Sequence, residues 1–215
     1  MKIALIAPLM ETIPPRLYGG SERVVSYLTE ELVAQGHDVT LFASGQSITS
    51  AKLVPCCAQA LRLKPAVKDI IPYYMLMLDK VRSMAPAFDI LHFHIDQFHF
   101  PIFNETATRT VTTLHGRQDL PDLHQLYRGF PDMPLVSISD AQREPVPKAN
   151  FVASGLNFAT KAVCGVETCT MGVHLVWSAP PVVLKSVDVV VPLMYALPDA
   201  STAIPPTVSV PEPPR

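Results

Sequence analysis

The sequence predicts an α/β domain, a Rossmann-like parallel sheet with helices on both faces, followed by an irregular proline-rich tail. Short apolar runs alternate with helix-compatible segments up to about residue 153. Strands joined through helices make right-handed crossovers, which favour a mostly parallel sheet. Only seven charged residues but nine prolines follow residue 150. We therefore expect one domain over residues 1–153 and an atypical tail over residues 154–215.

The first predicted strand, residues 2–7 (KIALIA), is a short apolar run of the kind that parallel sheets bury on both faces. Ser21 is the expected N-cap of the helix that follows, because its hydroxyl can accept from a free amide of the first turn. Gly36 is the expected left-handed residue after the last turn. The apolar face of this helix should comprise residues at three- and four-residue steps: Val24, Val25, Leu28, Leu32 and Val33.

The remaining elements are predicted from similar apolar runs and from the turn-forming residues that bound them. A second helix is predicted over residues 70–85, beginning after Pro72. Helix-compatible sequence also follows each of the strands expected from residue 88 to residue 139. The further predicted strands are residues 38–43, 52–57, 88–94, 110–115, 134–139 and 150–153.

Two adjacent glycines, Gly19 and Gly20, stand directly before the first helix. In parallel sheets, ligands bind beyond the carboxyl ends of the strands. A helix N-terminus there offers free amides and partial positive charge to a phosphate or carboxylate, and glycines let such an anion come close. The alternative is that the glycines only form a turn. The dinucleotide motif G-x-G-x-x-G is absent, and the loop from Pro8 to Gly20 is too long for it.

Three histidines lie in or near the strand at residues 88–94. His92 and His94 point the same way, which can be half of a metal site, but no third ligand has supportive spacing even though His99 is close. We therefore expect no metal. His92 is expected to be a core histidine with a backbone partner. His94 and Asp96, nearer the strand end, are better placed for substrate hydroxyls, with Asp96 as an acceptor or a base.

His115 ends the next apolar strand and is the strongest single candidate for a functional residue. Gly116 follows at once, so the backbone can turn away and leave the imidazole facing the crevice. Arg117 either pairs with an anion or lies exposed without a partner. Ser139 ends a later strand, where it either meets a ligand or joins Asp140 in capping the next helix.

Composition excludes several classes of protein. The 215 residues are 48% hydrophobic and 17% charged with a net charge of −2, so no basic face for nucleic acid is expected. Four cysteines, Cys56, Cys57, Cys164 and Cys169, lack zinc-site spacing and are expected to be free thiols in a reducing compartment. No segment reaches the roughly 18 uncharged apolar residues of a membrane span, and no nucleophile motif is present.

Four ordered segments carry a family resemblance: YGGSERVVSYLTEELVAQGHDVTLFASG, FDILHFH, TVTTLHG and LVSISDAQR. Together they resemble the N-terminal domain of family 4 retaining glycosyltransferases of the GT-B fold, over about residues 1–153. The resemblance implies transfer of a sugar from a nucleotide-sugar donor to a sugar or lipid acceptor, with retention of configuration. No cofactor is implied, because helix amides and basic side chains can neutralise the leaving diphosphate.

The resemblance also assigns residues. Gly19 and Gly20 are similar to the family's glycine loop near the donor diphosphate and the acceptor, and His115 matches the histidine beside the transferred sugar. His94 and Asp96 fall in the acceptor-side region, although Ile95 separates them here. The expected catalytic residues are thus His115 and Asp96, and the expected substrate-binding residues are Gly19, Gly20, His94, Arg117 and Ser139.

Family members close a second domain over the first, and it binds the nucleotide sugar with a basic pair and an E-x7-E motif. Neither feature follows residue 153. We therefore expect a truncated or frameshifted chain with little activity alone, in the cytoplasm or at the inner membrane face. The alternatives are a sugar- or anion-binding module, or half of an enzyme completed by a separate donor-domain chain. A homodimer through the face left exposed is a further expectation.

Overall fold

The computed structural model describes residues 1–62, 64–154, 170–174 and 188–192. Its main body is a seven-stranded sheet in which every neighbouring pair of strands is parallel, in the order β3-β2-β1-β4-β5-β6-β7. This confirms the predicted Rossmann-like fold class. The strands are β1 (Lys2–Ile6), β2 (Asp38–Ser44), β3 (Lys52–Cys57), β4 (Ile90–Phe93), β5 (Thr110–Thr113), β6 (Leu135–Ser137) and β7 (Phe151–Ser154).

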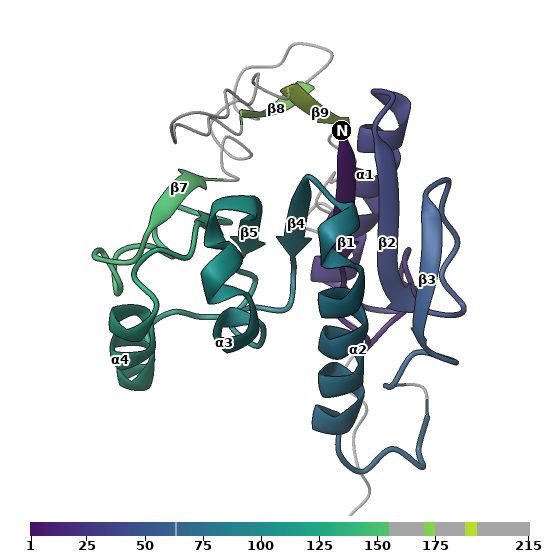
Figure 1. Ribbon diagram of the computed structural model, residues 1–215, viewed down its shortest axis with the longest axis horizontal. Coiled ribbons are helices and arrows are strands. Elements are labelled where there is room, and N and C mark those ends of the chain that lie inside the picture. The colour runs from purple at the N-terminus through teal and green to yellow at the C-terminus, as the bar shows by residue number, and fades with distance from the viewer. Residues whose placement is uncertain (63, 155–169, 175–187, 193–215) are drawn as a thin grey trace, which may run out of the picture.

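Helices connect most of these strands. Figure 1 shows α1 and α2 beside the half of the sheet that contains β1 to β3, and α4 at the opposite end. The α-helices are α1 (Gly20–Ala34), α2 (Ile71–Met84), α3 (Phe100–Phe103) and α4 (Pro121–Gly129), and two 3-10 turns cover Ala85–Ala87 and Asn104–Arg109. The strand order reverses direction between β1 and β4, which is where ligands bind in sheets of this kind.

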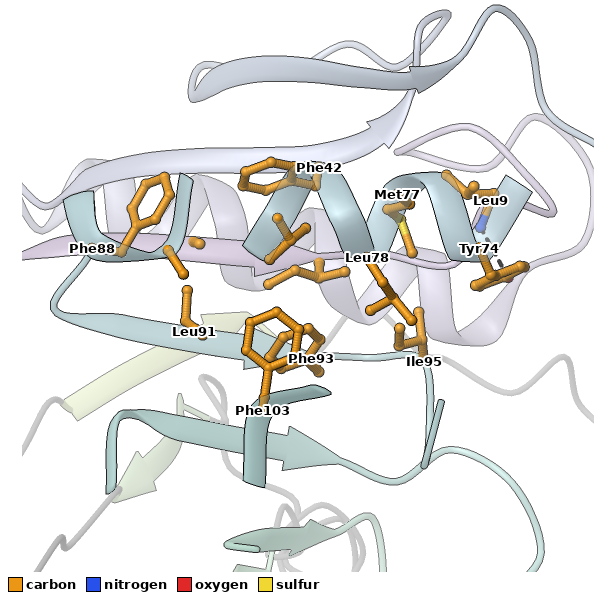
Figure 2. Close-up of a cluster of buried hydrophobic side chains, with 14 of the residues drawn as sticks. Leu9, Phe42, Tyr74, Met77, Leu78, Phe88, Leu91, Phe93, Ile95 and Phe103 are labelled. Carbon is orange, nitrogen blue, oxygen red and sulfur yellow. Dashed lines mark hydrogen bonds between the residues drawn. The ribbon is translucent and has the colours of Figure 1, made fainter. Parts of the chain in front are cut away.

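The two-residue period of β1 divides its side chains between two cores. Ile3 and Leu5 pack with the buried face of α1, whereas Ala4 and Ile6 face the cluster under α2. Figure 2 shows this second cluster, in which α2 residues meet aromatic side chains of β2 and β4. Full burial of one large apolar side chain contributes about 1.5–3 kcal/mol, so α1 and α2 hold the strands from opposite faces.

Helix α1 begins two residues earlier than predicted. Its N-cap is Gly19, the amide of Arg23 donates to the Gly19 carbonyl at 3.0 Å, and no side chain caps the helix. Ser21 is therefore a helical residue, and the prediction that it is the N-cap is wrong. Val24 is also wrong as a core residue because its side chain is 37% exposed. The buried face of α1 instead includes polar side chains, of which Thr29 donates its hydroxyl to the Val25 carbonyl at 2.7 Å.

The end of α1 is as predicted. Gly36 has a φ of +82°, the left-handed conformation that glycine adopts without strain. Its amide donates to Val33 O at 2.9 Å, and the amide of His37 donates to Leu32 O at 3.1 Å. These two bonds are the paired closing contacts of a Schellman motif.

The helix expected after the strand at residues 134–139 is absent between β6 and β7. Residues 138–150 form successive turns instead, in which Arg143 N bonds Asp140 O and Val146 N bonds Arg143 O, each at 3.0 Å. Pro145 and Pro147 explain the difference, because each removes a backbone donor that a helix would need.

The predicted tail contains two strands that the sequence did not indicate. Thr170–His174 (β8) pairs antiparallel with Asp188–Pro192 (β9). The rest of residues 155–215, with Cys164 and Cys169, lies outside the described residues, so the expected domain boundary stays a prediction.

Candidate functional site

The candidate residues lie along one edge of the sheet. The strands are parallel, so the residues after β1, β4, β5 and β6 follow carboxyl ends that face the same way. The amide of Asp38, just after α1, donates to Met1 O at 2.9 Å, which places the end of α1 at the start of β1. The beginning of α1, with Gly19 and Gly20, therefore lies at the same edge as His115.

Three histidines form a packed row at this edge. His94 Nδ1 and His115 Nε2 are 2.9 Å apart and share one hydrogen bond. His92 stacks on His94 with ring centroids 4.3 Å apart, and its Nε2 lies 2.8 Å from the hydroxyl of Thr113. His92 is a core residue as predicted, but its partner is this hydroxyl and not the backbone. The shared bond requires that one imidazole of the pair donates and the other accepts.

Burial keeps this row uncharged. It lowers the pKa of His92 to about 3 and the pKa of His94 well below its ordinary value, because an imidazolium loses its hydration there. Burial also lowers the pKa of His115, while the carboxylate of Asp96 acts to raise it. His94 is only 2% exposed, and its Nε2 has no hydrogen-bond partner among the described residues. The side chain of His94 is therefore shielded from solvent and hydrogen-bonds to His115.

Asp96 holds the turn that displays His115. Its Oδ1 accepts from the amide of His115 at 2.9 Å and from the amide of Gly116 at 3.2 Å. Asp96 itself has a φ of +49°, a left-handed conformation that aspartate tolerates better than most residues. A Cβ on Gly116 would lie 3.1 Å from Asp96 Oδ2, so the glycine allows this close approach. The role of Asp96 as a catalytic base stays a prediction.

Two glutamines complete the support of this turn, and sequence patterns did not single them out. Gln142 Nε2 donates to Leu114 O at 3.1 Å and to Gly116 O at 2.8 Å. Gln118 Nε2 also donates to Gly116 O, at 3.0 Å. Gln142 lies inside the segment LVSISDAQR, which carries the family resemblance. This position is the one feature of the sequence that indicates a role for Gln142.

The two glycines before α1 play different structural parts. A Cβ on Gly19 would lie 2.7 Å from Glu22 Oε2 and 2.9 Å from Pro15 Cβ, so this glycine makes room for the chain itself. A Cβ on Gly20 would meet nothing within 4 Å. Gly20 thus leaves open space at the first turn of α1.

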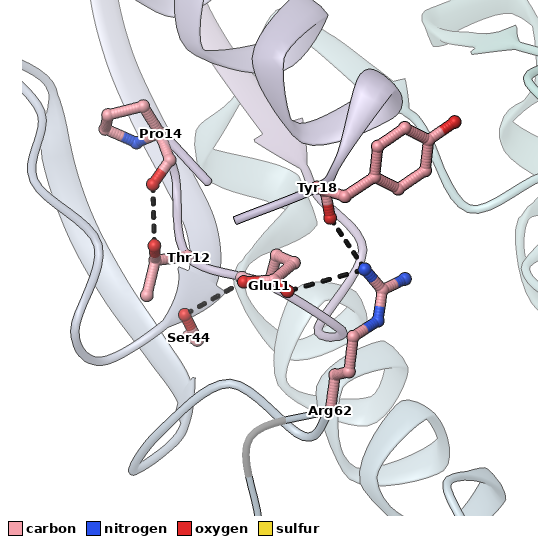
Figure 3. Close-up of polar contacts among 6 residues, drawn as sticks. All are labelled: Glu11, Thr12, Pro14, Tyr18, Ser44 and Arg62. Carbon is pink, nitrogen blue, oxygen red and sulfur yellow. Dashed lines mark hydrogen bonds and ion pairs between the residues drawn. The ribbon is translucent and has the colours of Figure 1, made fainter. Parts of the chain in front are cut away.

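Acidic side chains accompany the glycine loop and were also missed. Glu11 is fully buried, and Arg62 Nη1 lies 3.4 Å from its Oε1 while donating to Tyr18 O at 2.6 Å (Figure 3). Burial raises the pKa of Glu22 in the first turn of α1, and the charge of Arg62 opposes this rise. Two carboxyl groups and one guanidinium therefore surround the glycine loop.

The sequence matches the model of Glycosyltransferase Family 4 over residues 18–142, which is more than half of the chain. The chain belongs to Glycosyltransferase Family 4. No curated protein matches it.

Two solved structures are similar to the family 4 chain. AviGT4, a glycosyltransferase involved in avilamycin A biosynthesis, is 20% identical with a TM-score of 0.38, and the match covers 68% of this chain and 38% of that one. Sucrose-phosphate synthase from Thermosynechococcus elongatus is 12% identical with a TM-score of 0.49, covering 73% of this chain and 49% of that one. The family 4 chain thus spans less than half the length of either protein.

The last two predicted binding residues have partners within the family 4 domain. Arg117 makes two hydrogen bonds of 2.6 Å to the carboxylate of Asp119, and its side chain is 69% exposed. Ser139 accepts at Oγ from the amide of Gln142 at 3.1 Å, so it closes a turn and does not cap a helix. Substrate contacts of Arg117 and Ser139 stay predictions.

The described part of the domain contains no cluster of side chains suited to binding a metal ion and no activated thiol. No group of three or more His, Cys, Asp or Glu side chains there is placed to hold a metal ion. Cys56 and Cys57 are free thiols, and burial raises the pKa of Cys56 to about 12. Across the same residues, no helix combines the length and apolar character needed to cross a bilayer.

Proposed function

We propose that this family 4 domain is the acceptor-side half of a retaining glycosyltransferase that uses a nucleotide-sugar donor. The observation that carries the proposal is the uncharged His94–His115 pair, which lies at the same sheet edge as the open position of Gly20. In a member of a glycosyltransferase family, that edge is where a sugar and its diphosphate would meet.

The neutral state of His115 suits this chemistry. Positive charge develops on the sugar ring in the transition state of reactions that break a glycosidic bond. An imidazolium beside the ring would repel that charge, whereas a neutral imidazole can exchange hydrogen bonds with sugar hydroxyls. Burial lowers the pKa of His115 and so favours the neutral form at neutral pH.

The diphosphate would be met by the amides at the start of α1. Gly20 leaves space for a phosphate oxygen there, and helix amides stabilise such anions without a metal ion. His94 and Ser139 would contribute to sugar binding, and Arg117 would turn from Asp119 to the anion. We propose that no metal takes part.

We further propose that the 215-residue chain has little or no transferase activity alone. Its partner would be a separately encoded donor-domain chain, or a second copy bound through the exposed cleft face, in the cytoplasm or at the inner face of the membrane. A non-catalytic sugar-binding module is the second candidate. The use of Asp96 Oδ1 to hold two backbone amides favours it, because a carboxylate committed to the backbone has only Oδ2 left for a proton from a substrate.

Calorimetry with panels of free sugars and nucleotide sugars tests the proposal. We expect binding by the wild-type chain and at least about tenfold weaker binding by His115→Ala, a loss of about 1.4 kcal/mol. His124→Ala is the matched control, because this exposed histidine lies on α4 away from the row. Absence of binding to every compound, or equal weakening in both variants, would contradict the proposal.

Turnover separates the two candidates. Mass spectrometry of reactions with nucleotide sugars and acceptors should detect no product from the chain alone. Product from the isolated chain would disprove the proposed dependence on a second half. Sugar binding that persists without product, even after addition of a family 4 donor domain, would favour the binding module.

A further inference from the structure

We propose that Gln142 is a positioning residue which, together with Asp96, clamps the His115–Gly116 turn and sets the imidazole of His115 against His94. The significance of the clamp for sugar transfer rests on the function proposed above. The clamp itself is a property of the ligand-free chain and can be measured without a substrate.

The turn needs support because the sheet ends before it. The last backbone bond between β5 and β6 is from Leu114 N to Val136 O, at 2.9 Å. Beyond it, the carbonyls of Leu114 and Gly116 and the amides of His115 and Gly116 are bonded by side chains. The position of His115 therefore depends on those side chains and not on strand pairing.

Asp96 holds the amide side of the turn. Its Oδ1 binds the amides of both His115 and Gly116, and the left-handed φ of Asp96 brings the carboxylate to them directly after β4. Hydrogen bonds to a charged acceptor are roughly twice as strong as neutral ones, so this contact fixes the start of the turn firmly.

Gln142 holds the carbonyl side and also ties the turn to β6. Its Nε2 donates to Leu114 O and Gly116 O, while its Oε1 accepts from the amide of Ile138 at 2.8 Å. Its own amide donates to Ser139 Oγ, which orients the start of the side chain. A single half-buried amide thus joins the segments that follow β5 and β6.

The clamp matters because the bond between His94 and His115 is geometrically demanding. His94 is buried and packed against His92, so it cannot follow a displaced His115. A shift of the turn by about 1 Å would break the 2.9 Å contact, since hydrogen bonds weaken steeply beyond their normal range. Loss of this contact would free His115 to change tautomer and to take up water.

NMR of chain labelled with ¹⁵N-histidine tests the clamp through the pKa and the tautomer of His115. Gln142→Met removes every side-chain hydrogen bond of Gln142 while keeping its volume. We expect the pKa of His115 to rise toward 6.5 in this variant, because the ring leaves its buried place, and its single tautomer to give way to exchange. Gln46→Met, at an exposed glutamine, is the control and should change neither.

Asp96→Asn gives a shift of opposite sign. Asparagine keeps an oxygen for the two amides but loses the negative charge that acts to raise the pKa of His115. The pKa should therefore fall below the wild-type value while the tautomer stays the same. The groups that titrate around His115 are Asp96, His92 and His94, and the two histidines are neutral in all variants at neutral pH.

Two outcomes would overturn the clamp: an unchanged pKa and tautomer of His115 in Gln142→Met, or a rise of the pKa in both variants, which would indicate general loosening. If Gln142→Met does not fold, Gln142→Asn replaces it, because its amide is one methylene too short to reach both carbonyls. A confirmed clamp without any sugar binding by the wild-type chain would contradict the proposed function alone.

Discussion

His92, His94 and His115 show how burial sets the chemistry available to a side chain. Each imidazole sits where a positive charge would lose its hydration, and each makes a neutral hydrogen bond. The sequence predicted that His94 and His115 stand at strand ends. It did not predict that they bond to each other, because they lie 21 residues apart.

At the residue scale, Gly19 and Gly20 are predicted to respond differently to the same substitution. Gly19→Ala should reduce the free energy of unfolding by about 1–3 kcal/mol, because its Cβ would overlap Glu22 and Pro15. Gly20→Ala meets no atom within 4 Å and lies in the first turn of α1, so it should leave stability unchanged or raise it by up to about 1 kcal/mol. Urea unfolding measures both, and equal losses would contradict the different roles of the two glycines.

At the element scale, the C-terminal end of α1 follows a local rule more closely than its beginning or its buried face does. Gly36 ends α1 as predicted because a left-handed residue is a local requirement. The face of α1 was predicted less well, since Val24 is exposed and Thr29 is buried. The helix predicted between β6 and β7 does not form for a local reason, the prolines at 145 and 147. The prediction relied on the pattern of apolar residues and did not take these prolines into account.

The end of α1 supplies a prediction at this scale. Gly36→Ala should lower the free energy of unfolding by about 1 kcal/mol, because an alanine is strained at a φ of +82°. Gly129→Ala, at the end of α4, is the control. The φ of Gly129 is not positive and a Cβ there would meet no atom within 4 Å, so little or no loss of stability is expected. Thermal unfolding measures both variants. A similar loss in both variants would contradict a specific role for the left-handed conformation.

At the scale of the whole molecule, three clusters of buried apolar side chains pack against one sheet, and buried histidines lie on β4 and just after it. This arrangement makes stability depend on pH. In the unfolded chain a histidine binds a proton near pH 6.5, whereas folded His92 does so only near pH 3. Stability is therefore full above about pH 6.5 and falls as the pH drops from there toward 3.

The predicted loss from His92 is about 2 kcal/mol at pH 5. His92→Gln should be less stable than wild type at pH 7, because it loses the Thr113 contact, but its stability should fall less between pH 7 and pH 5. Urea unfolding at several pH values measures the slope. His124→Gln, at an exposed position, should keep the wild-type slope, and identical slopes in all three proteins would disprove the prediction.

Residue patterns along the chain predict the parallel α/β fold, the seven strands of its main sheet in chain order and the left-handed end of α1. These follow from side-chain periodicity and from residues that act locally, such as Gly36. Which strand ends meet is seen only in the folded chain: β4 lies beside β5 and β5 beside β6, which brings His94 to His115, Asp96 to the following amides and Gln142 to the same turn. Contacts across neighbouring strands depend on lateral order and register, and a linear pattern of residues contains neither.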